Sequence, residues 1–211
     1  MLKAIAFDLD NTLYNQDDYE LFALKEVAEK ISRLYGKSSD EYFYQLRELY
    51  FSGVRSRTFD IMMQSVHGKL PDDWEEAMQK VILPTYRAST PNLKLFPEAR
   101  ILLDTLKKKE CRIALITNGN ELIQNKKIDL LGIRDYFDKI YISDSYSPPS
   151  RKPDLRMFED FLEDFSILGL EAAYFGDNED SDGSCVKLDI EFFHVREPRD
   201  LLKTVILKFV N

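Results

Sequence analysis

The sequence of 211 residues lacks the features of disulfide-bonded, secreted or membrane-spanning proteins. It has two cysteines, Cys111 and Cys185, which form no metal-binding or redox spacing and are too few for a disulfide framework in a chain of this size. No apolar run approaches the roughly 20 residues that are needed to span a bilayer. The chain leads directly into a predicted strand, so we expect no signal peptide. These absences favour a cytoplasmic protein with no membrane partner.

Basic residues are also scarce relative to acidic ones. The chain has 29 Lys and Arg against 37 Asp and Glu, which gives a formal net charge of −8. Such a balance argues against a general nucleic-acid-binding surface, because phosphate backbones are bound by basic patches. A small phosphorylated ligand is still compatible, since it needs only a few local donors. The oligomeric state cannot be read from the sequence.

The most informative segment is "KAIAFDLDNTLY", residues 3–14. Ile5, Ala6 and Phe7 are typical of a short buried strand. Asp8 and Asp10 come at its C-terminal end, two residues apart, so both carboxylates are expected on the same side. Two like charges at this spacing repel each other, and a cation between them would offset the repulsion. Carboxylate oxygens are hard ligands of the kind that Mg²⁺ prefers. The pattern favours a nucleophilic aspartate beside a metal ion, although a simple acidic turn is the alternative.

The remaining pattern divides the chain into two parts. Residues 15–92 read as four helices with no convincing strand, whereas strands and helices alternate after Pro91. With the first strand, the predicted strands lie near residues 3–9, 112–117, 138–143, 173–176 and 190–195. We therefore predict an α/β fold, with a Rossmann-like, parallel, five-stranded sheet as its core and an inserted α-helical (four-helix) cap domain. Residues 1–14 and 93–211 would form the core domain, and residues 15–92 the cap domain. A further helix is predicted over residues 198–210.

Ligands of open α/β sheets bind at the C-terminal ends of the strands, so the residues there are the candidate site. Besides the first pair, the strand "IALITNGN" ends in Thr117 and Asn118, and "AYFGDNEDSD" supplies Asp177, Asp180 and Asp182. Lys152 lies in "SRKPDLRMF", before a predicted helix. Each of these has a simple structural explanation on its own, as a helix cap, a solvated lysine or an acidic turn. Together they supply an attacking carboxylate, metal ligands, hydrogen-bond donors and a neutralising cation.

The motifs "DLDNT", "ITN", "RKPD" and "GDNEDSD", in this order, resemble those of the haloacid dehalogenase-like (HAD) hydrolase superfamily. The resemblance covers essentially the whole chain, and the helical block after the first motif resembles the subfamily with a helical cap at that position. The form "FDLDNTLY" is similar to the nucleotidase-like branch. Two stretches differ from the family pattern, namely "SDSYSPPSRKPD" before Lys152 and "GSCVKLD" after the fourth motif, and neither removes a catalytic group.

The resemblance implies a role for each matching residue. Asp8 would be the nucleophile that forms an aspartyl-phosphate, and Asp10 would be the general acid and base and would offer its backbone carbonyl to Mg²⁺. Thr117 and Asn118 would bind the phosphoryl group, and Lys152 would neutralise charge on Asp8 and the phosphate. Asp177 would be the main acidic Mg²⁺ ligand, with Asp8 as a further ligand. Asp182 would be the second acid of the fourth motif, with Asp180 as the competing choice.

The function implied by the resemblance is a Mg²⁺-dependent phosphatase for a small phosphorylated metabolite, with a nucleoside 5′-monophosphate as the leading substrate. The presence of Asp10 as a second acid favours phosphoryl transfer over dehalogenation, because a halide ion leaves without taking up a proton. A phosphomutase, a phosphonate hydrolase and a non-catalytic binding protein are the alternatives. A phosphonate hydrolase would need a lysine of the cap that forms a Schiff base. Lys25 and Lys30 lie in the predicted cap, but the surrounding sequence pattern is typical of solvent-exposed residues. The polar cap residues Tyr14, Asp17, Tyr19, Arg55 and Arg57 could set specificity, but their roles stay open.

Overall fold

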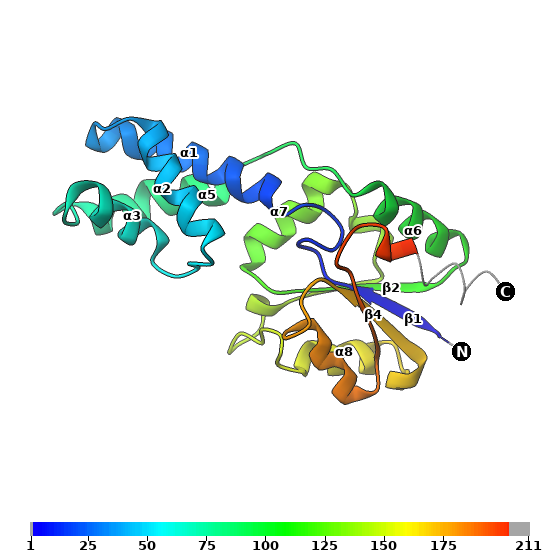
Figure 1. The fold of residues 1–211 in the computed structure, drawn as a ribbon. Coiled ribbons are helices and arrows are strands. Elements are labelled where there is room, and N and C mark those ends of the chain that lie inside the picture. Colours follow the sequence, from blue (N-terminus) through cyan, green and yellow to red (C-terminus); the bar gives the residue numbers. More distant parts are fainter. Residues whose placement is uncertain (1, 203–211) are drawn as a thin grey trace. The chain divides into compact units, whose positions relative to one another are not determined.

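The protein is described by a computed structural model over residues 2–202, and it divides into two compact units (Figure 1). The first unit joins the N-terminal segment up to Gln16 to the chain from Leu93 onward, and the second spans Asp17–Asn92. Each unit has its own hydrophobic core. The assignment of the second unit as a cap over the active site stays a prediction.

The first unit is built on a parallel sheet of five strands, as predicted. The strand order is β3-β2-β1-β4-β5, so the N-terminal strand lies at the centre. Every neighbouring pair is parallel, and the C-terminal ends of all strands therefore share one edge. The strands are β1 (Ala4–Phe7), β2 (Arg112–Thr117), β3 (Lys139–Ile142), β4 (Ala172–Gly176) and β5 (Glu191–His194).

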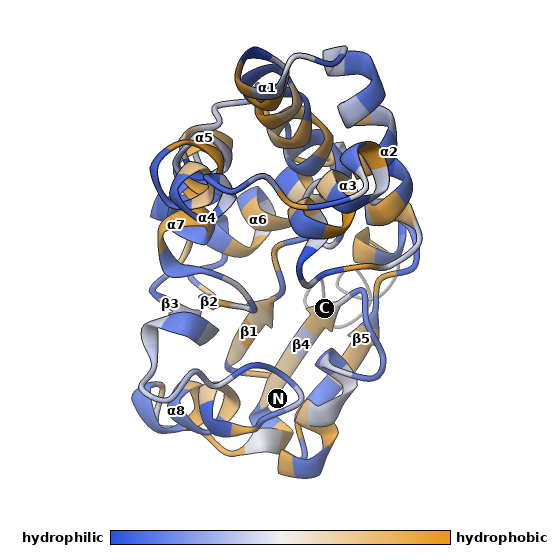
Figure 2. Ribbon diagram, turned by 90° about the vertical axis from the view of Figure 1, so that its left-hand side faces the viewer, coloured by the Kyte–Doolittle hydropathy of each residue, from blue (hydrophilic) through white to orange (hydrophobic). Residues whose placement is uncertain are grey.

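Helices cover both faces of this sheet, with α8 on one face and α6 and α7 on the other (Figure 1). They are α6 (Pro97–Lys108), α7 (Glu121–Leu131) and α8 (Arg156–Asp164). Ala4 and Ala6 of β1 leave room for the aromatic side chains of Phe158 and Phe161 in the core under α8. The central strands are apolar along their length (Figure 2), as strands buried on both faces must be. Short 3₁₀ turns complete the unit at η2 (Arg134–Tyr136), η3 (Ser143–Ser145), η4 (Gly169–Glu171) and η5 (Asp182–Leu188).

The second unit, Asp17–Asn92, consists of helices and the loops that connect them, with no strand. Its helices are α1 (Asp17–Tyr35), α2 (Ser39–Phe51), α3 (Thr58–His67) and a fourth helical run made of α4 (Trp74–Ala77), η1 (Met78–Ile82) and α5 (Leu83–Ala88). Its core gathers apolar side chains from all of them around Ile31, Leu46 and Met62, which are fully buried. The four predicted helices are therefore present.

The fourth helical run contains a π-helical turn that the sequence pattern did not predict. Segment η1 has π-helical hydrogen bonding, and Pro84 follows it in the first turn of α5. Proline has no N–H to donate, and its ring clashes with the carbonyl four residues earlier, here that of Lys80. A wider turn before Pro84 avoids that clash while the helix continues.

Two further predictions concern the chain ends and the membrane. The predicted helix over residues 198–210 begins at Asp200, and beyond Leu202 it lies outside the described residues. Among the described residues, we find no helix with the length and apolar character that a membrane crossing requires.

Candidate active site

Three strand ends bring polar side chains to one edge of the sheet. Asp8 directly follows β1, Thr117 is the last residue of β2, and Asp177 directly follows β4. The Asp8 N–H donates a hydrogen bond of 2.8 Å to the Phe175 carbonyl, which continues the pairing of β1 with β4 up to the site. Because β1 lies between β2 and β4, Asp8 is at the centre of this edge.

A buried lysine connects the side chains at this edge. The Lys152 Nζ donates to Asp8 Oδ1 at 2.7 Å and to Asp182 Oδ1 at 2.6 Å. It also lies 2.7 Å from the Tyr174 hydroxyl and 3.0 Å from the Ile116 carbonyl. An ammonium group has three hydrogens for these four oxygens. The Tyr174 hydroxyl itself donates to the Ile116 carbonyl at 3.0 Å, which leaves one lysine hydrogen for the tyrosine oxygen.

The backbone of Lys152 is held by Asn118. The Asn118 Oδ1 accepts from the Lys152 N–H at 2.8 Å, and its Nδ2 donates to the Lys152 carbonyl at 3.1 Å. The family resemblance implies that Asn118 binds a phosphoryl group. In the structure its side chain holds the loop that carries Lys152, and one amide hydrogen remains for a ligand.

Three carboxylates crowd together beside the lysine. One oxygen from each of Asp8, Asp177 and Asp182 lies within 4.8 Å of the others. Burial raises the pKa of Asp8 well above its ordinary value, Lys152 opposes this shift, and Asp182 and Asp177 add to it. Burial and the neighbouring Asp182 raise the pKa of Asp177 to about 6. One lysine does not balance three carboxylates, so the cluster favours a further cation.

The lysine nevertheless stays charged. Burial lowers the pKa of Lys152, but Asp8 and Asp182 raise it by more, and the net shift is upward. Its ammonium group therefore remains a fixed positive charge next to the Asp8 carboxylate at neutral pH.

The structure separates the two acidic residues between which sequence reasoning could not choose. Asp182 is buried, with Oδ1 on Lys152 and Oδ2 accepting from the Asn178 N–H at 3.1 Å. Asp180 is exposed and lies outside the cluster. A Cβ at Gly176 would lie 2.3 Å from Asp182 Oδ2, so glycine at the end of β4 leaves room for this carboxylate. The geometry favours Asp182 as the second acid of the fourth motif.

Comparison with known protein families identifies the family of the chain. The family of haloacid dehalogenase-like hydrolases matches residues 2–184 of the chain. The chain belongs to this family. The resemblance seen in the motifs is therefore confirmed.

Several named proteins and solved structures are similar to this HAD-family chain. Glyceraldehyde 3-phosphate phosphatase of Methanocaldococcus jannaschii is 27% identical over 188 residues, which cover 86% of this chain and 79% of that protein. Phosphoglycolate phosphatase of Aquifex aeolicus is 27% identical over 161 residues, which cover 75% of this chain and 70% of that protein. A HAD-superfamily hydrolase of subfamily IA from Geobacter sulfurreducens has the same fold, with a TM-score of 0.69, 22% identity and coverage of 92% and 86%.

Asp10 is not a member of the three-carboxylate cluster and has its own hydrogen-bond partners. Its Oδ1 accepts from Lys127 Nζ at 2.8 Å and from the Tyr14 hydroxyl at 2.5 Å, and its Oδ2 accepts from Gln124 Nε2 at 2.9 Å. Gln124 Nε2 also reaches Thr117 Oγ1 at 2.7 Å. Burial raises the pKa of Asp10, but Lys127 and the hydrogen bonds lower it by more, and the net shift is downward.

Sequence reasoning missed Lys127 and Gln124. The signal that could have revealed them is their place on α7, because the buried positions Gln124, Lys127, Ile128 and Leu131 follow the spacing of the inward face of a helix. Polar side chains on such a face need a buried partner.

The polar residues proposed to set specificity lie in both units. Tyr14 belongs to the first unit and contacts Asp10. In the helical unit, Asp17 accepts from the Tyr50 hydroxyl at 2.8 Å, and the Arg55 guanidinium lies 4.7 Å from the centre of the Tyr50 ring. Arg57 pairs with Asp60, and the Tyr19 hydroxyl donates to the Tyr86 carbonyl. These contacts explain the local packing and leave a role in substrate choice as a prediction.

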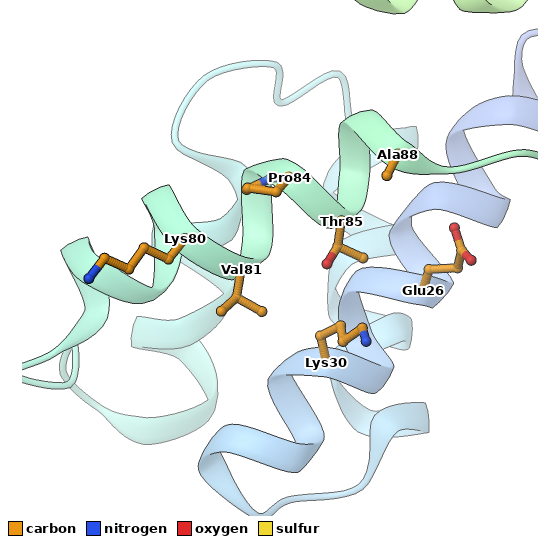
Figure 3. Close-up of a pocket in the computed structure, with 7 residues that line it drawn as sticks. All are labelled: Glu26, Lys30, Lys80, Val81, Pro84, Thr85 and Ala88. Carbon is orange, nitrogen blue, oxygen red and sulfur yellow. The ribbon is translucent and has the colours of Figure 1, made fainter.

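The helical unit also has an open groove of about 460 Å³ (Figure 3). Residues of α1 line one side and residues of η1 and α5 the other, namely Glu26, Lys30, Lys80, Val81, Pro84, Thr85 and Ala88. Lys80 pairs with Glu76 at 2.7 Å. The groove contains none of the predicted site residues.

The Lys152 network predicts the effect of removing one hydroxyl. Tyr174→Phe should lower the free energy of unfolding by about 1.5–3 kcal/mol, because the buried ammonium loses a hydrogen-bond partner. The control Tyr44→Phe removes the hydroxyl of a side chain that is 56% exposed, and should change stability by less than about 0.5 kcal/mol. Urea denaturation measures the free energy of unfolding of both variants. Equal values for the two would contradict a stabilising role of the Tyr174 hydroxyl in the Lys152 network.

Proposed function

We propose that this HAD-family protein is a Mg²⁺-dependent phosphomonoester hydrolase that works through an aspartyl-phosphate on Asp8. The observation that carries the proposal is the Asp8 carboxylate at the central strand end, paired with Lys152 at 2.7 Å and grouped with Asp177. A carboxylate attacks a phosphate ester poorly until positive charge screens the repulsion between them. The fixed lysine supplies part of that charge.

The reaction would proceed in two displacements. In the first, an Asp8 oxygen attacks phosphorus, the ester P–O bond breaks, and the leaving oxygen takes a proton from the Asp10 carboxylic acid. Asp8 Oδ1 is bonded to Lys152, so we assign Oδ2 as the attacking atom. In the second, a water oxygen attacks phosphorus, its proton passes to Asp10, and the bond to Asp8 breaks to release inorganic phosphate. Thr117, 1% exposed, would donate its hydroxyl hydrogen to a phosphoryl oxygen.

The residues present are suited to a divalent cation. Asp8 and Asp177 supply hard carboxylate oxygens in a cluster with excess negative charge, and burial together with the neighbouring Asp182 raises the pKa of Asp177. We propose that Asp8, Asp177 and the Asp10 carbonyl hold Mg²⁺, with Asp182 engaged mainly by Lys152. When bound, the ion would neutralise charge on the transferring phosphoryl group.

The substrate class we propose is a small phosphorylated metabolite. Relatives that match most of the chain are named for glyceraldehyde 3-phosphate and phosphoglycolate, which are phosphate monoesters of two or three carbons. This supports testing such compounds together with the nucleoside 5′-monophosphates that the first motif suggests. The identity of the relatives, below 30%, supports the reaction class more strongly than a particular substrate.

The reaction is tested by phosphate release from a panel of monoesters with and without Mg²⁺. Glyceraldehyde 3-phosphate, phosphoglycolate, sugar phosphates and nucleoside 5′-monophosphates make up the panel. Asp8→Asn should reduce release at least about a thousand-fold, because an amide oxygen cannot replace the nucleophile. Turnover by a folded Asp8→Asn variant near the wild-type rate would exclude this mechanism. No release from any ester by the folded wild-type protein would favour a phosphomutase, a phosphonate hydrolase or a binding protein.

The metal assignment is tested by a matched pair of variants. Mg²⁺ should raise the melting temperature of the wild-type protein, since a ligand that binds the folded state stabilises it. Asp177→Asn should raise the Mg²⁺ concentration needed for half of this effect at least about ten-fold, because the site loses a charged ligand. Asp180→Asn removes the same charge from an exposed position nearby and should leave the response unchanged. Equal responses of both variants would contradict the role of Asp177.

A further inference from the structure

A second lysine–aspartate pair, with a buried lysine and a partly buried aspartate, involves the other aspartate of the first motif. The Lys127 side chain, 3% exposed, reaches from α7 to Asp10, with 2.8 Å between Nζ and Oδ1. The two residues are 117 positions apart in the sequence. An isolated buried lysine is costly, so a partner is expected for structural reasons alone. Asp10, however, accepts more hydrogen bonds than the one that a charge partner for Lys127 requires.

The Asp10 carboxylate is fixed in orientation as well as in charge. Oδ1 accepts from Lys127 and Tyr14, while Oδ2 accepts from Gln124. Bonds on both oxygens prevent rotation of the carboxylate plane, which a single ion pair would allow. A proton donor or acceptor in catalysis has to be aimed at the reacting atom within about an ångström.

Gln124 connects Asp10 to the predicted phosphoryl-binding hydroxyl. The two hydrogens of its Nε2 point to Asp10 Oδ2 at 2.9 Å and to Thr117 Oγ1 at 2.7 Å. A hydroxyl group has one hydrogen and two acceptor sites. Since Gln124 donates to the Thr117 oxygen, the hydroxyl hydrogen of Thr117 is available for a phosphoryl oxygen.

The first turn of α7 is shaped to hold Gln124. Gly119 has φ +145°, and a Cβ there would lie 3.0 Å from the Gln124 Cγ and Cδ atoms. Asn120 caps the helix, since its Oδ1 accepts from the N–H groups of Leu122 and Ile123. The cap fixes where α7 begins, and the glycine leaves space for the glutamine at the sheet edge.

We propose that Lys127 and Gln124 are positioning residues that aim the Asp10 carboxyl group at the ester oxygen of the substrate. This inference rests on the proposed function, because it assigns them to the step in which Asp10 gives its proton to the leaving oxygen. Neither side chain touches the substrate in this scheme. Losing either should slow that proton transfer and leave substrate binding nearly unchanged.

The test compares two esters that differ in their need for a proton. An alkyl phosphate such as glyceraldehyde 3-phosphate releases a basic alkoxide, whereas p-nitrophenyl phosphate releases a stable phenolate. Lys127→Met should lower kcat/KM for the alkyl ester about 100-fold, which is the effect of losing or misaiming a general acid. It should lower kcat/KM for p-nitrophenyl phosphate less than about five-fold, because that leaving group needs no proton. Lys126→Met removes the same charge from the neighbouring residue and should change neither rate more than about two-fold.

A double-mutant cycle with Asp10→Asn separates positioning from general damage. If Lys127 acts through Asp10, then Lys127→Met should change the rates of the Asp10→Asn protein less than about three-fold. Gln124→Met, which alters no charge, should show the same selective loss for the alkyl ester, about ten-fold. It serves as the test variant if Lys127→Met does not fold, which circular dichroism would reveal.

The outcomes distinguish this inference from the proposed function. Equal losses for both esters, or a full effect of Lys127→Met in the Asp10→Asn background, would overturn the positioning role while Asp8-dependent hydrolysis still stands. If the wild-type protein shows no hydrolysis that depends on Asp8, both the proposed function and this inference are wrong. A selective loss that disappears without Asp10 supports both.

Discussion

The ion pair between Lys152 and Asp8 is the interaction on which the rest of the site depends. Its two side chains are 2% and 8% exposed, and removing such charges from water costs several kcal/mol per ion. The fold offsets this cost with specific partners, namely Asp182 and the Tyr174 hydroxyl on the ammonium group and Asn118 on the lysine backbone. Buried pairs of this kind rarely add stability. Their value here is that a charged lysine stays beside a carboxylate at the strand edge.

The two aspartates of the first motif lie in different electrostatic environments, although two positions separate them. The pKa of Asp8 is raised by burial and by neighbouring acids, whereas the pKa of Asp10 is lowered by Lys127 and its hydrogen bonds. Distinct environments for two carboxylates are how a site gives them distinct tasks. In the proposed reaction, Asp8 would need added positive charge to act as a nucleophile, and the lowered pKa of Asp10 favours its ionised form, which would accept a proton from water. An incoming phosphate dianion would raise the pKa of Asp10 and favour its acid form.

Sequence reasoning predicted the sheet well because parallel strands buried on both faces appear as short apolar runs, and the residues that follow them mark the site edge. Asp8, Thr117 and Asp177 were therefore placed at strand ends correctly. The choice between Asp180 and Asp182 required the structure, since both follow β4 within a few residues. Tyr174 resembles an ordinary strand aromatic until its hydroxyl is seen on Lys152. Lys127 and Gln124 were missed because their partner Asp10 is more than a hundred residues away.

The central claim is that a phosphoryl group is transferred to Asp8. Rapid acid quench of the Mg²⁺-loaded protein with a ³²P-labelled ester, followed by peptide mapping, tests it most directly. We predict acid-stable, base-labile label on the peptide that contains Asp8, at a rate no slower than turnover. Label that is absent during steady turnover, or attached to another residue, would contradict the account.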